Sequence, residues 1–160
     1  MKSWKRTLGA GLCTVALVAG AAPAGADQVV NTVDSTIDKA PETMNLTVGG
    51  GAGNTTIWVN ATEDKSEGSA VCNIGNLQKL VLNVVSSKPG IATVPTTIEI
   101  RDCGEDKGAS LPVTPVAAGT SKITLSVNSA TTASGNFDLQ PAQFEANVAA
   151  ASSPPPPPPP

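Results

Sequence analysis

Short apolar segments in which every second residue is polar recur along this 160-residue chain, and they constrain its fold more than any other feature. In the clearest segment Ile123, Leu125 and Val127 alternate with a threonine and a serine. A period of two places alternate side chains on opposite faces of a β-strand. Glycine, proline and asparagine separate the segments, and no segment keeps a helical period over the length of a typical helix. The pattern therefore predicts an all-β sandwich of about seven to nine short strands.

Apolar residues at similar spacing define the other expected strands. These residues are Met44, Leu46, Val48, Ile57, Val59, Ala61, Leu80, Leu82, Val84, Ile91, Val94, Ile98, Ile100, Leu111, Val113, Val116, Phe137, Leu139, Phe144, Ala146 and Val148. Pro112 and Pro115 lack the N–H that an inner strand donates. The segment that contains Leu111 is therefore expected at a sheet edge.

Residues 1–26 have the composition of a removable export signal. Basic residues stand near the N-terminus, and an apolar stretch rich in small residues follows from Leu8 to Ala22. Ala24-Gly25-Ala26 fits the small-residue rule for cleavage, so the mature chain is expected to begin at Asp27, with a cut after Ala24 as the alternative. A retained membrane anchor is the competing interpretation, but the apolar run is short of the ~20 residues that span a bilayer. We therefore expect a secreted or extracellular chain without a membrane span after signal removal.

Composition divides the rest of the chain into further parts. Residues 27–40 are polar with scattered valines and are expected to form a flexible N-terminal segment, whereas residues 41–148 carry the strand pattern and are expected to form the sandwich. Residues 149–160 are an Ala/Ser/Pro-rich tail, expected to be disordered, that ends in the prolines Pro154–Pro160. These prolines would span about 22 Å as a stiff polyproline II spacer. The alternative is that the chain is a piece of a longer protein, in which the spacer leads to another domain.

Two cysteines, Cys72 and Cys103, remain after the expected cleavage. In an exported protein such a pair predicts a disulfide, and free thiols are the alternative. The bond would close a loop of about 30 residues and contribute ~3.5–4 kcal/mol in the chain-entropy model. The chain has no histidine, so two thiolates cannot complete a four-ligand zinc site, and no cofactor is expected.

The charge of the mature chain restricts its partners. Without residues 1–26 it keeps seven basic and thirteen acidic residues, a net charge of −6. Nucleic acids and anionic membranes do not attract such a chain. The expected partner is therefore a surface protein or a polysaccharide, whose identity the sequence does not specify.

Two stretches carry a family resemblance. Ser87-Lys88-Pro89-Gly90-Ile91-Ala92-Thr93-Val94 is similar to an S-x-P-x-I-A-T-V pattern, and Val116–Leu125 is similar to x-A-x-G-T-x-x-I-T-V. In this order and separation they resemble the bacterial immunoglobulin-like domains of group 2, the invasin/intimin-like type, over Leu80–Val148. The Ala/Gly/Pro-rich composition of the expected signal resembles that of actinobacterial proteins.

The resemblance implies an immunoglobulin-like β-sandwich with a cell-surface, adhesive or spacer role and no catalytic residues. The chain departs from the family in its cysteine pair, which most members lack. It also lacks the Cys…Trp…Cys spacing of antibody domains, so a disulfide across the core is not implied.

Trp58 is the one tryptophan of the mature chain and the candidate ligand-binding residue. If Ile57 and Val59 face the core, Trp58 faces outward, where an indole stacks on a sugar or anchors a protein partner. With the opposite strand parity, Trp58 would belong to the core.

Acidic residues occur in two groups that a disulfide would bring to one end of the sandwich. Converging carboxylates there would hold calcium, although the spacing fits no calcium-loop motif and solvated charges are the commoner outcome. The candidate ligands are Asp64, Glu67, Asp102, Glu105 and Asp106, with Glu63 beside them.

Catalysis has little support in the sequence. Without histidine no Ser-His or Cys-His pair exists, and no carboxylate pair stands out for sugar hydrolysis. We therefore expect a chain without catalytic activity that acts as a structural spacer or as a binding and adhesion domain. The alternative is a carbohydrate-binding module associated with an extracellular enzyme.

Overall fold

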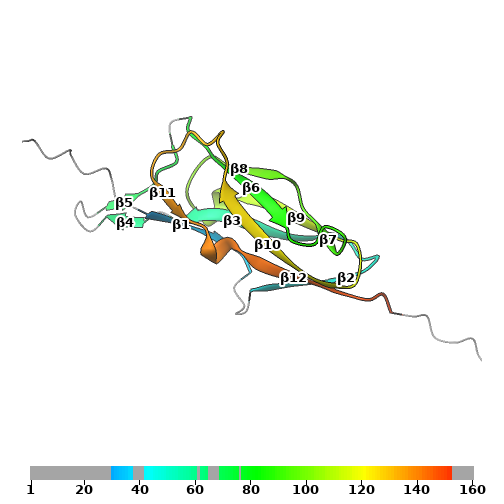
Figure 1. Ribbon diagram of the computed structural model, residues 1–160. Coiled ribbons are helices and arrows are strands. Elements are labelled where there is room, and N and C mark those ends of the chain that lie inside the picture. The colour runs from blue at the N-terminus through cyan, green and yellow to red at the C-terminus, as the bar shows by residue number, and fades with distance from the viewer. Residues whose placement is uncertain (1–29, 38–41, 61, 65–68, 76, 153–160) are drawn as a thin grey trace, which may run out of the picture.

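The structure is a computed structural model that describes residues 30–37, 42–60, 62–64, 69–75 and 77–152. Two five-stranded sheets face each other around a shared core, and a short two-stranded hairpin extends from one end (Figure 1). The fold is an immunoglobulin-like β-sandwich, so the predicted fold class is confirmed. The described residues contain twelve strands, more than expected, because several pairings involve only two or three residues.

The first sheet is built around β3. Its strands in spatial order are β11 (Asn136–Asp138), β1 (Val30–Ser35), β3 (Gly53–Asn60), β9 (Ala109–Pro115) and β7 (Ala92–Thr93). The pair β1–β11 is parallel and the other pairs are antiparallel. The expected edge position of the proline-containing strand is wrong: β9 lies between β3 and β7, although β7, which forms the edge, has only two residues.

The second sheet is built around β10. Its strands in spatial order are β2 (Thr43–Thr47), β12 (Phe144–Ala149), β10 (Gly119–Val127), β6 (Leu80–Ser86) and β8 (Thr97–Ile100). The pair β2–β12 is parallel and the others are antiparallel. The remaining elements are β4 (Thr62–Asp64), β5 (Ser69–Val71) and the 3₁₀ turns η1 (Glu105–Lys107) and η2 (Gln140–Ala142).

The core lies between the two sheets and follows the predicted alternation. Ile57, Leu82 and Ile123 are completely buried, as are both Leu111 and Val113 of β9. Aliphatic side chains predominate, and Phe144 is the one buried aromatic residue in the described part of the chain. The core is therefore built mainly from aliphatic side chains, many of them β-branched, which suit a pleated surface.

The expectation of a flexible N-terminal segment at residues 27–40 is wrong for residues 30–35. These residues form β1, an inner strand that pairs with β11 on one side and β3 on the other. Its buried side chains are Asn31, Val33 and Ser35, of which only Val33 is apolar. A strand whose inward face is mostly polar shows no apolar alternation, which explains the error.

Two valines expected at the core are partly exposed instead. Val127 is 46% exposed at the end of β10, beyond which the chain leaves the sheet, and Val116 is 47% exposed after β9. Both stand where the strand ends and the opposite sheet no longer covers the side chain. The expected signal (residues 1–26), Ala61, and the prolines of the tail lie outside the described residues.

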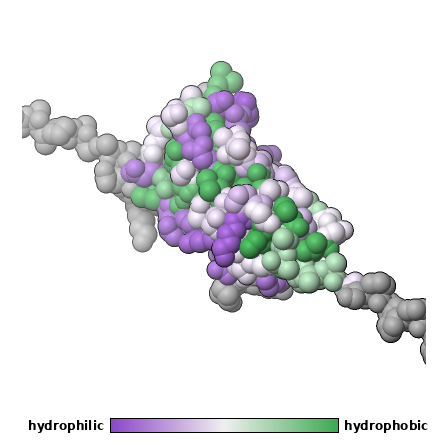
Figure 2. All heavy atoms as spheres, turned by 45° about the vertical axis from the view of Figure 1, so that its right-hand side comes forward, coloured by the Kyte–Doolittle hydropathy of each residue, from purple (hydrophilic) through white to green (hydrophobic). Residues whose placement is uncertain are grey.

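The described chain enters and leaves the sandwich at opposite ends of its long axis. Figure 1 shows β1 starting at the end that carries β4 and β5, while β12 runs to the far end, next to β2. Hydrophobic residues gather beside this far end (Figure 2). A tensile load through the two ends would therefore run along the strands.

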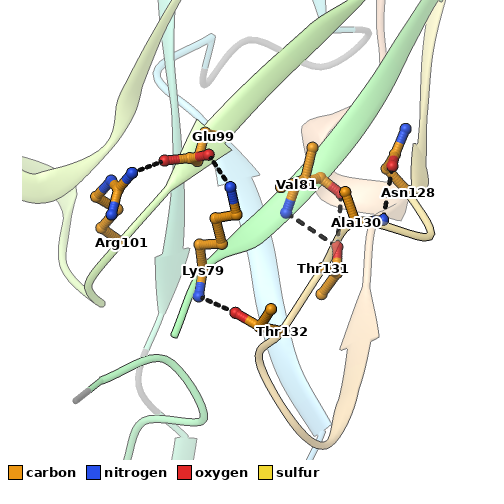
Figure 3. Close-up of polar contacts among 8 residues, drawn as sticks. All are labelled: Lys79, Val81, Glu99, Arg101, Asn128, Ala130, Thr131 and Thr132. Atoms are coloured by element: carbon orange, nitrogen blue, oxygen red, sulfur yellow. Dashed lines mark hydrogen bonds and ion pairs between the residues drawn. The ribbon is translucent and has the colours of Figure 1, made fainter. Parts of the chain in front are cut away.

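The loop after β10 is fastened to β6 by side chains. The Thr131 hydroxyl donates to the Val81 carbonyl (2.9 Å) and accepts from the Val81 N–H (3.0 Å), while the Thr132 hydroxyl accepts from the Lys79 N–H (3.0 Å) (Figure 3). The Asn128 carboxamide caps the turn by accepting from the Ala130 N–H (2.8 Å). The loop thus satisfies backbone groups at the start of β6 that no strand covers.

Candidate functional site

A disulfide holds the chain that leads into η1, one wall of the candidate site. Cys72 follows β5 and Cys103 follows β8, and their Cα atoms are 5.9 Å apart in a bonded pair. The predicted disulfide is confirmed. Both residues pack against the edge of the core, so the bond fastens the chain after β8 to the chain after β5.

The segment that follows Cys103 lies across the outer face of β3. The Gly104 N–H donates to the Val59 carbonyl (2.8 Å), and Gly104 has a φ of +119°, which favours glycine. At the other end of η1, Gly108 lies against β3: an added Cβ would be 2.7 Å from the Ile57 carbonyl oxygen and 2.9 Å from Trp58 Cβ. The bare backbone of Gly108 therefore lets η1 approach the strand closely.

Trp58 lies on the outer face of β3, with the parity that the sequence favours. Its neighbours Ile57 and Val59 are completely buried, whereas Trp58 is half-buried. Asp34 of β1 is its cross-strand partner, and Gly108 contacts it from the side of β9. Trp58 is thus partly open to solvent on this face.

An open hollow of about 440 Å³ lies between this face of the sheet and η1. It is lined by Thr36, Thr56, Glu105 and Asp106. Thr56 precedes Trp58 by two residues on β3 and therefore shares its face of the strand.

The threonine wall of the hollow is held in place by hydrogen bonds. The Thr36 hydroxyl accepts from the Thr56 N–H (3.2 Å) and is 3.0 Å from the hydroxyl of Thr55, which is buried. The Thr36 N–H donates to the Thr56 carbonyl (3.1 Å). Sequence reasoning missed this wall because Thr36 falls in the segment that was expected to be flexible.

The candidate calcium ligands are only partly brought together. Glu105 and Asp106 line the hollow, whereas the Asp102 carboxylate accepts the Cys103 N–H (2.9 Å). Asp64 belongs to β4, and Glu67 lies outside the described residues. Within the described part of the chain no three Asp, Glu, Cys or His side chains group as a metal site would require.

Glu99 forms the ion-pair network of the second sheet, on β8. Its carboxylate contacts Lys79 Nζ at 2.8 Å and Arg101 Nη2 at 2.5 Å (Figure 3). The hydrogen bond from Lys79, supported by the charge of Arg101, holds the pKa of Glu99 below its ordinary value of 4.5. This cluster ties β6 to β8 and is separate from the hollow.

The two stretches that carry the family resemblance meet in the structure. The Ser121 hydroxyl of β10, which is completely buried, lies 2.8 Å from the Ser86 hydroxyl and accepts from the Lys88 N–H (3.0 Å). Gly119, at φ +143°, packs on Ile91, where an added Cβ would be 2.7 Å from Ile91 Cδ1. The two stretches therefore pack against each other. This contact accounts for the serine, glycine and isoleucine residues found there, without a bound ligand.

The chain shows the architecture of an immunoglobulin-like β-sandwich. No model of a known protein family matches its sequence, and no curated protein does so either. No helix among the described residues has the length and apolar character that a membrane span needs.

Several solved structures are similar to it. Domains 4 and 5 of the S-layer protein SbsC share 19% identity over 76% of this chain and 52% of that chain, with a TM-score of 0.42. A longer SbsC structure shares 19% identity over 78% of this chain and 14% of that chain, with a TM-score of 0.45. WR4, a C. elegans MSP family member, shares 18% identity over 74% of this chain and 97% of that chain, with a TM-score of 0.41. The chain thus spans about half of the two-domain SbsC fragment. These likenesses concern the fold and assign no activity.

Proposed function

We propose that this chain is an extracellular, non-catalytic immunoglobulin-like module that acts as a spacer at a cell surface. The observation that carries the proposal is that β1, the first described strand, starts at one end of the sandwich and β12, the last, finishes at the other (Figure 1). A module built in this way separates whatever precedes it from whatever follows it by its whole length.

Three further features support the proposal. The disulfide between Cys72 and Cys103 is of the kind that persists in oxidising compartments. The first residues of the chain have the composition of an export signal. The lack of histidine removes the commonest general base of enzymes. The group-2 family resemblance remains a hypothesis about ancestry.

Energy transfer between two fluorescent reporters tests the spacer role. Residues 27–160 are placed between the reporters and compared with a Gly/Ser linker of equal length. The domain is expected to give a narrow distribution of distances, whereas the flexible linker gives a broad one. An equally broad distribution for the domain would refute the spacer role.

Pulling on single molecules tests the same role under load. The unfolded chain is expected to lengthen further when reductant is added, because the disulfide bridges residues 31 apart in the sequence. At ~3.6 Å per residue the gain is about 110 Å. Unfolding without a resolved force peak would contradict a load-bearing spacer.

A further inference from the structure

We propose that the hollow between β3 and η1, with Trp58 on the same face of β3, binds a neutral saccharide. This inference goes beyond the spacer role and does not depend on it. It rests on the side chains gathered on one outer face of the first sheet and on how firmly that face is built.

The chemistry of the lining suits a polyhydroxylated ligand. Carboxylates such as those of Glu105 and Asp106 accept strong hydrogen bonds from hydroxyl groups, and the threonine hydroxyls both donate and accept. A half-exposed indole offers a flat apolar surface for the C–H face of a sugar ring. Hydrogen-bond donors and acceptors therefore line one open hollow of about 440 Å³, and Trp58 stands on the same face of β3, two residues after Thr56.

The hollow is pre-organised. The chain of η1 is tied to β3 at Val59 through Gly104, packed on Trp58 through Gly108, and held at Cys103 by the disulfide. The opposite wall is held by the hydrogen bonds of Thr36. A ligand that enters such a site orders few groups and loses little entropy on binding.

The charges of the site favour a neutral ligand over an anionic one. Anionic polysaccharides are repelled by the Glu105 and Asp106 carboxylates. Lys107 lies 3.2 Å from the Asp106 carboxylate and offsets part of the negative charge of the site.

The fluorescence of the protein tests the site directly. Trp58 is the one tryptophan after residue 26, and the chain contains no tyrosine, so the emission of the mature, oxidised chain comes from the indole beside the hollow. Titration uses soluble linear oligosaccharides of glucose, mannose, xylose and N-acetylglucosamine, with polygalacturonate as the anionic probe and polylysine as the cationic one. We expect a saturable change in emission with at least one neutral saccharide and none with polygalacturonate.

Calorimetry on variants assigns the binding to these residues. Trp58→Ala, and independently Glu105→Gln combined with Asp106→Asn, are expected to weaken the binding of that saccharide at least tenfold. The second variant changes only exposed side chains, so it keeps the test valid if Trp58→Ala fails to fold. Glu145→Gln removes an exposed carboxylate on β12 of the other sheet and is expected to leave the affinity unchanged.

Three outcomes would overturn the proposal. One is a flat titration with every neutral saccharide. Another is a saccharide affinity that both site variants leave unaltered. The third is a response to polylysine alone, which would identify the face as a docking surface for a cationic protein segment.

Discussion

Gly108 decides how closely η1 approaches β3. A side chain at this position would meet Thr56 Cγ2, the Ile57 carbonyl and Trp58 Cβ at once, and two of these are backbone atoms or atoms fixed to the backbone. The conformation of Gly108 is an ordinary extended one, with a φ of −65°, so the restriction is purely steric. The hollow therefore depends on the absence of one methyl group.

Gly108→Ala is expected to lower the free energy of unfolding by about 1–3 kcal/mol, because the added Cβ forces η1 away from the strand. Urea unfolding measures the change. Gly51→Ala is the matched control, since an added Cβ there meets nothing within 4 Å. Equal effects of the two substitutions would show that η1 does not pack on β3 as described.

Ser121 is the second residue whose replacement is expected to change the stability of the domain more than its small side chain suggests. It is completely buried and its hydroxyl connects the turn after β6 to β10. Ser121→Ala leaves the Lys88 N–H and the Ser86 hydroxyl without this partner, at an expected cost of about 1–3 kcal/mol. Thermal unfolding checks the loss against Ser126→Ala, an exposed serine on the same strand that is expected to be neutral. A similar loss in both would argue against this role of the Ser121 hydroxyl.

At the scale of the elements, the sequence indicates which side chains of a strand point into the core only where the inward face is apolar. In β3, Ile57 and Val59 indicated that face and hence the outward position of Trp58. In β1 the inward face is Asn31, Val33 and Ser35, so the strand was missed. The Thr36 wall of the hollow was missed with it, because that wall exists only once β1 pairs with β3.

The pairing of β6 with β8 is expected to depend on pH through Glu99. Its folded pKa lies below the ordinary 4.5, so its stabilising contribution is complete above about pH 4.5 and is lost as the pH falls through the folded pKa. Glu99→Gln is therefore expected to lower the melting temperature at neutral pH, and the difference from the parent chain should vanish under strong acid. Differential scanning calorimetry across this pH range measures both.

High salt provides the control for this ion-pair network. The three side chains are partly exposed, so added salt should reduce the neutral-pH difference between the two proteins. A difference that persists unchanged into strong acid would contradict the assigned role of Glu99.

At the scale of the whole molecule, the disulfide compensates for a core almost without aromatic residues. A small domain is stable by only about 5–15 kcal/mol. A bond between residues 31 apart restricts the unfolded chain and therefore supplies a large share of that free energy of unfolding. The same bond holds η1 over β3. Both the stability of the domain and the geometry of the proposed site therefore depend on this disulfide.

Replacement of both cysteines by serine is expected to cost about 4 kcal/mol of unfolding free energy. Urea unfolding of the oxidised parent and of the double variant measures the loss. Reductant should destabilise the parent to the same extent and leave the variant unchanged. A loss under about 1 kcal/mol would show that the bond does not restrict the unfolded chain as the entropic model requires.

The sequence by itself determined the all-β class, the cysteine pair and the parity of strands such as β3 and β10, because alternation and composition are local properties that a chain displays before it folds. The tertiary structure decided the place of β1, whose buried face is mostly polar, and the position of η1 over Trp58. Those features depend on which segments meet in space: an asparagine or a serine becomes an inward residue only when a neighbouring strand supplies its pairing, and a hollow exists only between elements that are distant in the sequence.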